Sequence, residues 1–150
     1  MENELFSNKL KEFLVKMGYE EATIEERDMT GEKIYEVSVG DAKYLIGEKG
    51  TNLTALEFLV KMICQKQDIP IVKTFVDING YRKEKAKLLK EAARLAAQKA
   101  VLSGKPVLLP PMSGFDRKVI HIELAINPSV TTESAGYSPE RYVVIKPYLN

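Results

Sequence analysis

Hydrophobic residues in the first part of the chain recur at spacings that predict two helices and a β-hairpin. Residues 5–17 carry apolar side chains at helical intervals and end at Gly18, a residue that favours a left-handed helix terminus. Residues 22–27 and 34–39 are β-rich and flank a glycine-containing turn. A short helical turn is predicted near residues 42–46, and a longer helix follows, with apolar positions at Leu53, Leu56, Val60 and Ile63.

The segment 71–79 alternates in the way that predicts a half-buried strand. Pro70 prevents the preceding helix from continuing into it. One side of the strand is expected to carry Val72, Thr74, Val76 and Ile78, and the other Lys73, Asp77 and Asn79. Gly80 then offers a hinge.

The remaining chain predicts two helices and three short strands. Residues 82–102 are rich in helix formers, and a narrow apolar stripe follows Ala86, Leu89, Ala93, Ala96, Ala97 and Ala100. A strand is expected at 106–109, and Ser113 can cap a helix that runs to about Ile126, with Asp116 three residues into it. Two strands, at 131–137 and 141–146, complete the pattern.

This order of elements predicts an α+β fold made of two small modules, residues 1–80 and 81–150. Each module is expected to pack helices against an antiparallel or mixed three-stranded sheet. The length of 150 residues is compatible with this division, and the sequence contains no visible internal repeat.

Composition narrows the class of protein. The chain is 45% hydrophobic and 29% charged, as is usual for a soluble globular protein. No run of about 18 apolar residues is present, and the N-terminus is acidic where a secretory signal would be basic. We therefore expect a cytoplasmic protein that does not insert into the membrane. Cys64 and His121, the sole cysteine and histidine, are too few for a zinc site, so no metal or cofactor is predicted.

Charge divides the chain into unlike halves. Residues 1–80 carry 10 Lys and Arg against 15 Asp and Glu, whereas residues 81–150 carry 12 against 6. A basic half favours an anionic partner, because neutralised phosphates supply most of the sequence-independent affinity for nucleic acid. An imbalance without function is the alternative.

Gly47 and Gly50 flank two residues between predicted helices. Such a loop lets a sugar-phosphate backbone approach closely, and the amides of the next helix favour a phosphate. Glu48 opposes this, and a tight helix connection is the alternative interpretation. The residues predicted to bind RNA in this loop and the adjoining groove are Ile46, Gly47, Lys49, Gly50, Thr51 and Lys73.

Arg117 and His121 are one turn apart on the helix over 113–126. Together they could hold a phosphate or stack on a base, although a surface arginine beside a structural histidine is the alternative. We expect the opposite face of this helix to be apolar, with Phe115, Val119, Ile122 and Ile126. Ile120 and Leu124 lie close to the Arg117 side, so partial cover of that side by the helix over 82–102 is the alternative. Lys118 and Arg141 are further candidate contacts.

Four basic residues form a stripe on the helix over 82–102. Glu84 and Glu91 fall elsewhere on the helix, so the stripe is expected to be unneutralised and to favour phosphate, although many such stripes are only solvated. Its members are Lys83, Lys87, Lys90 and Arg94.

The stretch Leu45-Ile46-Gly47-Glu48-Lys49-Gly50-Thr51-Asn52-Leu53-Thr54-Ala55-Leu56 resembles the signature of a K-homology (KH) domain. The element order of residues 1–80 matches the bacterial, type II topology. KH domains usually carry a basic residue between the glycines, which Lys49 supplies, and Glu48 departs from the doubly basic pattern.

The second half resembles an R-3-H domain (Arg, three residues, His) over roughly residues 81–147. The resemblance rests on Arg117-x-x-x-His121, on Asn127-Pro128-Ser129-Val130-Thr131-Thr132-Glu133-Ser134, and on Arg141-Tyr142-Val143-Val144-Ile145-Lys146-Pro147. A type II KH domain followed by this domain is similar to the bacterial Jag family.

That family resemblance implies a cytoplasmic RNA-binding protein. It also implies a link to a membrane protein insertase by gene neighbourhood, and to control of cell elongation and division. Many members begin with a further small domain and a charged linker. The sequence shows neither, so we expect a member without that domain.

Two functions follow as hypotheses. The first is a non-enzymatic binder of single-stranded RNA, with single-stranded DNA an open alternative because nothing visibly reads a 2′-hydroxyl. The second is an adaptor that engages another KH protein or a membrane-associated partner, with RNA secondary. A homo-oligomer is a further candidate assembly. An enzyme is not expected, because the chain has no nucleophile elbow, phosphate-binding lysine motif or metal-ligand cluster.

Overall fold

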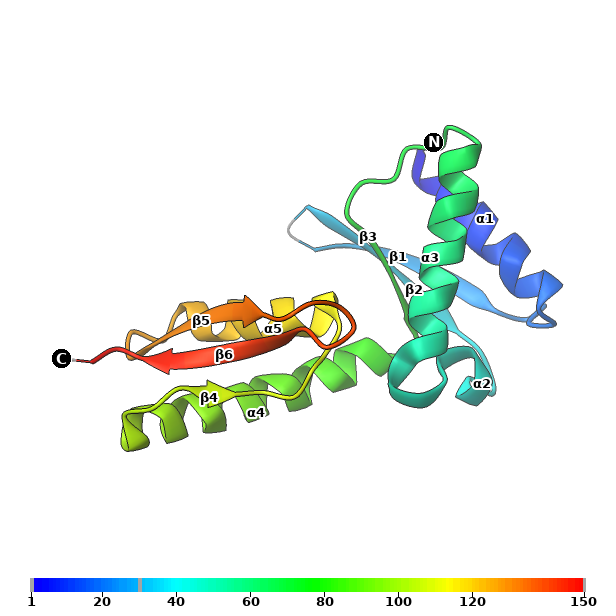
Figure 1. The fold of residues 1–150 in the computed structure, drawn as a ribbon. Coiled ribbons are helices and arrows are strands. Elements are labelled where there is room, and N and C mark those ends of the chain that lie inside the picture. Colours follow the sequence, from blue (N-terminus) through cyan, green and yellow to red (C-terminus); the bar gives the residue numbers. More distant parts are fainter. Residues whose placement is uncertain (1, 30, 150) are drawn as a thin grey trace. The chain divides into compact units, whose positions relative to one another are not determined.

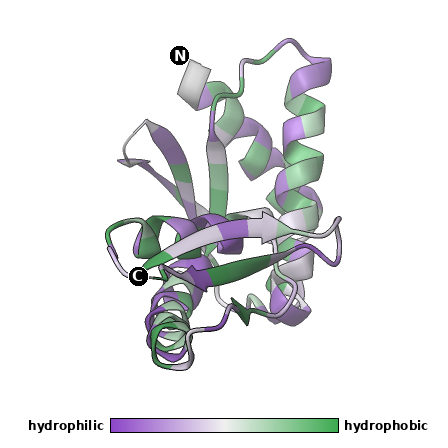
Figure 2. Cartoon of the chain, turned by 60° about the vertical axis from the view of Figure 1, so that its left-hand side comes forward, coloured by the Kyte–Doolittle hydropathy of each residue, from purple (hydrophilic) through white to green (hydrophobic). Residues whose placement is uncertain are grey.

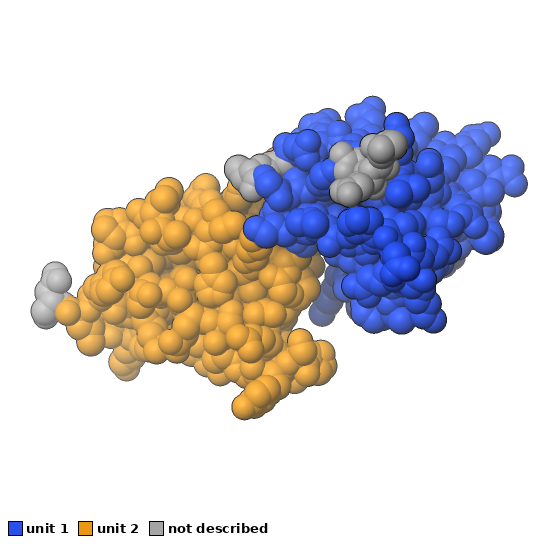
Figure 3. All heavy atoms as spheres, turned by 90° about the horizontal axis from the view of Figure 1, so that it is seen from above, with its two compact units in different colours: residues 1–83 blue, residues 84–150 orange. Residues whose placement is uncertain are grey.

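The computed structural model describes residues 2–29 and 31–149, which divide into two compact units, residues 1–83 and 84–150 (Figure 3). Each unit has its own three-stranded sheet packed with helices and its own hydrophobic core. The predicted α+β fold class is therefore confirmed, and the two units are described separately below.

Unit 1 contains three α-helices and a mixed sheet. In chain order its elements are α1 (Glu2–Lys16), β1 (Thr23–Met29), β2 (Glu32–Ser38), α2 (Lys43–Ile46), a 3₁₀ turn η1 (Glu48–Gly50), α3 (Thr51–Lys66) and β3 (Thr74–Ile78). The sheet order is β1-β2-β3, with β1 antiparallel and β3 parallel to the central β2. Helices α1 and α3 pack on each other and on the strands (Figure 1). Their apolar faces meet the sheet in a core that includes Leu10, Leu14, Tyr35, Leu53, Val60 and Val76.

Strand β3 departs from the prediction at both ends. It begins at Thr74, and Val72, expected on the buried side, is exposed. Asp77, expected on the polar side, is buried and serves a different purpose. Its carboxylate accepts hydrogen bonds from the backbone N–H groups of Ile78, Arg82 and Lys83, and the last two lie in the first turn of the next helix.

Unit 2 is built on a long helix and an antiparallel sheet. Helix α4 (Tyr81–Ser103) starts in unit 1 and is followed by β4 (Val107–Leu108), α5 (Gly114–Ala125), β5 (Val130–Ala135) and β6 (Tyr142–Pro147). The sheet order is β4-β6-β5 (Figure 1). Hydrophobic and hydrophilic residues are mixed around each helix (Figure 2). The core joins residues of α4, α5 and the sheet, namely Ala93, Ala96, Ala97, Ala100, Ile120, Leu124, Val130, Val143 and Ile145.

Helix α5 begins where the sequence predicts, because the Ser113 hydroxyl accepts a hydrogen bond from the N–H of Asp116. The predicted apolar face is wrong at two of its four positions, however, because only Phe115 and Val119 are partly buried. Ile122 and Ile126 are exposed, and the buried residues of the helix are Asp116, Ile120 and Leu124. The sheet therefore lies on the side of α5 that carries Arg117 and His121. No helix in the described residues is both long and apolar enough to cross a membrane.

Candidate nucleic-acid interface

The Gly47–Gly50 loop joins α2 to α3 through a single turn of 3₁₀ helix. Glu48 and Lys49 are exposed at its tip, and the Lys49 backbone has a φ of +53°. The Thr51 hydroxyl donates to the carbonyl of Glu48 at 2.9 Å, and the Asn52 amide donates to the carbonyl of Tyr44 at 2.7 Å. These bonds hold the loop in one shape and leave its two charged side chains pointing into solvent.

The two glycines of this loop are required by the protein's own packing. Both have left-handed φ values, +73° at Gly47 and +77° at Gly50. A Cβ at Gly47 would lie 2.6 Å from the Asn52 side chain, and one at Gly50 would lie 2.8 Å from the ring of Tyr81. The surfaces beside the glycines are thus already occupied by neighbouring side chains.

The loop brings together most of the residues predicted to bind RNA in unit 1. Ile46 packs against the core, and Lys49 and Thr51 are exposed at the start of α3. Lys73 is the exception. Its carbonyl accepts a hydrogen bond from the N–H of Lys33 at the start of β2, whereas α2 and the loop follow the end of β2. The structure therefore does not place Lys73 with the loop.

In unit 2, Arg117 and His121 face two hydroxyl groups of the edge strand β5. The imidazole Nδ1 lies 2.7 Å from Thr132 Oγ1, and Nε2 lies 2.8 Å from Ser134 Oγ. Arg117 also donates to Ser134 Oγ, at 3.3 Å. Sequence reasoning gave Thr132 and Ser134 no role, although the alternation of β5 places both on one face.

His121 is held as a neutral imidazole near neutral pH. Burial lowers the pKa of His121 below its ordinary value of 6.5, and the neighbouring positive charge of Arg117 lowers it further. With both ring nitrogens hydrogen-bonded, the ring is fixed in orientation. The positive charge of this pair is therefore that of Arg117 alone.

Arg117 and Arg141 each retain a buried N–H with no partner in the described residues. The two atoms are the Nε of each guanidinium. One Nη of each guanidinium is hydrogen-bonded near the end of β5. Arg117 donates to Ser134 Oγ, and Arg141 donates to the carbonyl of Gly136, just after the strand, at 3.5 Å. Each Nε–H is therefore an unsatisfied donor inside the protein, on an arginine that is anchored near the end of β5.

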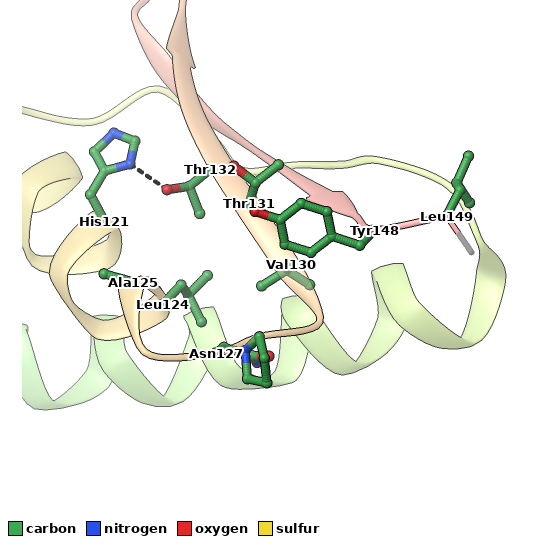
Figure 4. Close-up of a pocket in the computed structure, with 10 residues that line it drawn as sticks. His121, Leu124, Ala125, Asn127, Val130, Thr131, Thr132, Tyr148 and Leu149 are labelled. Carbon is green, nitrogen blue, oxygen red and sulfur yellow. Dashed lines mark hydrogen bonds between the residues drawn. The ribbon is translucent and has the colours of Figure 1, made fainter.

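A groove of about 690 Å³ continues from His121 along the same side of β5. Figure 4 shows His121 at one end and Tyr148 and Leu149 at the other. Tyr148 is 61% exposed, so a planar ligand could reach it. The lining also includes Leu124, Asn127, Val130 and Thr132. Lys118, the residue after Arg117 on α5, is exposed.

The basic stripe of α4 is less free than predicted. Lys87 forms an ion pair with Glu84 at 3.1 Å, and Arg94 forms one with Glu123 of α5 at 2.6 Å. The expectation of an unneutralised stripe is therefore wrong at these two positions. Glu84, which was expected to lie elsewhere on α4, reaches Lys87 from three residues before it, and Glu123 reaches Arg94 from α5. Lys83 and Lys90 remain exposed.

Comparison with known proteins gives the second unit a family. A family model for the R-3-H domain matches residues 87–147. This range contains Arg117, His121, Thr132, Ser134 and Arg141, so the matched domain is the one that carries the site.

Curated relatives match a longer part of the chain. The RNA-binding protein KhpB of Lactiplantibacillus plantarum is 40% identical over 101 residues, which are 67% of this chain and 31% of that protein. KhpB of Clostridium symbiosum is 31% identical over 105 residues, 70% of this chain and 47% of that protein. KhpB of Bacillus subtilis is 29% identical over 130 residues, 85% of this chain and 62% of that protein.

The chain thus spans between about a third and three fifths of the length of the relatives that it matches. The longest of these matches extends over most of the chain. The chain belongs to the KhpB (Jag) family and carries an R-3-H domain.

Proposed function

We propose that this protein binds single-stranded RNA without catalysing a reaction on it. The observation that carries the proposal is the pair of half-buried arginines, Arg117 and Arg141, whose guanidinium groups are both anchored near the end of β5. Membership of a family whose relatives are named RNA-binding proteins supports the choice of ligand.

Unit 2 supplies the phosphate contacts in this proposal. The positive charges of Arg117 and Arg141 attract a backbone phosphate to the end of β5, and Lys118 adds an exposed cation. The neutral His121 ring joins α5 to β5 through its hydrogen bonds to Thr132 and Ser134. The exposed ring of Tyr148 then offers a stacking surface for a base in the adjoining groove.

Unit 1 acts as a type II KH domain in this proposal. Its element order and mixed sheet support this assignment, as does the Gly47–Gly50 loop at the start of α3. Lys49 is the exposed cation of the loop, and Glu48 beside it reduces the positive potential. We therefore assign most of the phosphate affinity to unit 2 and the positioning of a short stretch of bases to unit 1.

Filter retention of a labelled single-stranded RNA by the full chain tests the proposal. Arg117→Ala and Arg141→Ala should each weaken binding about 10-fold or more, because a hydrogen bond to a charged group contributes about 1.5–3 kcal/mol. The plot of log affinity against log salt should also become shallower in each variant. Arg27→Ala is the matched control, since Arg27 is paired with Glu36 in unit 1. Unchanged affinity in both arginine variants contradicts the proposal.

The cellular role that we infer is post-transcriptional regulation in the cytoplasm, linked to cell elongation and division or to envelope biogenesis. Crosslinking the protein to RNA in cells and sequencing the bound fragments tests this role. Enrichment of messages for those processes supports it, and a random sample of cellular RNA contradicts it. The same filter-retention assay with single-stranded DNA shows whether the protein prefers RNA or DNA.

An adaptor role is the second candidate, and the acidity of the first half favours it. Residues 1–80 carry 15 Asp and Glu against 10 Lys and Arg, a balance that suits a basic protein better than a nucleic acid. Pull-down of the full chain before and after ribonuclease treatment distinguishes the two. A partner such as another KH protein that survives digestion favours the adaptor, and loss of all partners favours RNA.

A further inference from the structure

Helix α4 carries a row of exposed leucines on the side that faces away from its own core. Leu88, Leu95 and Leu102 follow one another at intervals of seven residues and are 68%, 60% and 88% exposed. At 100° per residue they fall within about 40° of each other around the helix, opposite the buried alanines. We call these three residues the leucine row.

Such a row has the spacing of a helix that packs against another helix. A seven-residue repeat keeps apolar side chains on one seam over several turns, and Leu is a preferred residue at the centre of such a seam. The row extends over four turns of α4, and Ala92 lies beside it, where a close approach meets no large side chain. The partner that fits must present a similar row.

Two charged residues beside the leucine row determine which partner fits. Glu91 and Lys99 flank the row, both are exposed, and neither forms an ion pair with any residue that the structure describes. Glu91 lies four residues before Leu95, and Lys99 lies four residues after it. Leu88 and Leu102 are related to Leu95 in the same way, seven residues to either side.

This pattern is self-complementary in one orientation only. A two-fold axis through Leu95 that pairs α4 with an antiparallel copy sets Leu88 against Leu102 and Glu91 against Lys99, twice each. A parallel copy would instead set Glu91 against Glu91. An interface that a two-fold axis maps onto itself is the commonest form of homodimer.

We propose that the protein forms a homodimer through antiparallel packing of α4, centred on Leu95. Each dimer then carries two copies of every nucleic-acid-binding unit. One RNA strand that engages both copies would gain affinity through the raised effective concentration of the second site. The dimer does not depend on the RNA-binding proposal, because it forms in the absence of RNA.

Analytical ultracentrifugation of the nuclease-treated full chain in high salt measures the assembly directly. The wild type should sediment as a dimer, and Leu95→Glu, which places two carboxylates at the axis, should raise the dissociation constant at least tenfold. Ile126→Glu is the matched control and should leave the dimer intact, because Ile126 is 86% exposed directly after the end of α5. A wild type that stays monomeric at high concentration overturns the proposal.

Exchange of the two charges tests the orientation. Glu91→Lys should weaken the dimer in low salt, because Lys at position 91 then faces Lys99 of the partner, and adding Lys99→Glu to it should restore the dimer. Failure of the double variant to recover contradicts antiparallel pairing. Both residues are exposed, so these variants leave the core of unit 2 untouched.

Disulfide trapping supplies a geometric check in a Cys64→Ala background, which removes the sole native thiol. Leu95→Cys should crosslink to itself on oxidation, because the axis brings the two side chains together. Leu88→Cys should not, since two such residues would lie about 21 Å apart along antiparallel helices. A mixture of Leu88→Cys and Leu102→Cys should crosslink. Self-crosslinking of Leu88→Cys would indicate parallel packing and overturn the proposal.

Discussion

The imidazole of His121, a candidate ligand-binding group, uses both of its ring nitrogens for hydrogen bonds within the protein. Its two ring nitrogens lie within 2.8 Å of hydroxyl oxygens of Thr132 and Ser134. Arg117 can only donate, so Ser134 Oγ must accept from it while also bonding the imidazole. The ring is therefore a structural link between α5 and β5 that positions the arginine.

The lowered pKa of His121 makes part of the folding free energy dependent on pH. The folded chain takes up a proton on His121 at lower pH than the unfolded chain does, whose value is near 6.5. The stability contributed by the neutral ring is complete above that value and is lost as pH falls below it. Urea unfolding at pH 7.5 and 5.5 should show a smaller loss in His121→Gln than in the wild type. Equal losses would show that His121 is not responsible.

Substitution of Gly50 can separate the effect of a steric clash from the effect of backbone strain. Gly50→Ala combines a left-handed φ with a clash against the Tyr81 ring, whereas Gly31→Ala has a similar φ of +80° and nothing within 4 Å. We expect a loss of about 1 kcal/mol for Gly31→Ala from conformation alone. Gly50→Ala should lose about 2–3 kcal/mol, because overpacking adds to the strain. Denaturant midpoints measure both, and equal losses would rule out the Tyr81 contact as the cause.

At the scale of elements, the sequence predicted nearly every helix and strand but misassigned some of their faces. Period-2 and period-3.6 patterns locate an element, and the Ser113 cap located the start of α5. The patterns do not reveal which partner covers a face. Ile122 and Ile126 were expected to be buried on α5, yet β5 covers the side that bears His121.

Asp77 is the second such case, since alternation predicts a polar outward residue and the structure buries it. Its carboxylate replaces the missing hydrogen-bond partners of the first turn of α4, a task that only the three-dimensional arrangement reveals. The functional residues show the same limit. Arg117 and His121 can be found from spacing, whereas Thr132, Ser134 and the groove around Tyr148 depend on how β5 aligns with α5.

Removal of the Asp77 carboxylate should therefore destabilise the start of α4. We expect Asp77→Ala to lower the free energy of unfolding by about 1–2 kcal/mol, the usual effect of losing a helix-capping side chain. Asp28→Ala, at an exposed position of β1, is the control and should have little effect. Amide exchange should also quicken at Arg82 and Lys83, whose N–H groups bond to Asp77. Unchanged protection at these two amides contradicts the capping role.

At the scale of the whole molecule, the chain contains two separate hydrophobic cores. Leu10 is fully buried in the first and Ile120 in the second. The compact units divide between Lys83 and Glu84. The predicted boundary between residues 80 and 81 is a boundary between domains that fold independently, and it stays a prediction. Sequence patterns cannot locate such a boundary inside a continuous helix, because helix formers occupy both sides of it.

Core substitutions test whether the two units unfold separately. Leu10→Ala and Ile120→Ala should each destabilise by about 2–5 kcal/mol. Hydrogen exchange read by mass spectrometry should then show lost protection mainly in residues 1–83 for Leu10→Ala and in residues 84–150 for Ile120→Ala. Loss of protection throughout the chain in either variant would indicate one cooperative unit.

The buried thiol of Cys64 can report on the opening of unit 1. The side chain is fully buried in α3, and burial raises the pKa of the thiol, so a reagent that attacks thiolates meets neither access nor ionisation in the folded state. Labelling can then proceed only through molecules whose first core has opened. Because the sequence contains no other cysteine, the rate of modification by an electrophile is a clock for the opening of unit 1. This measurement needs no engineered probe. A slower rate of Cys64 labelling in the presence of RNA would measure how strongly RNA prefers the closed state of unit 1.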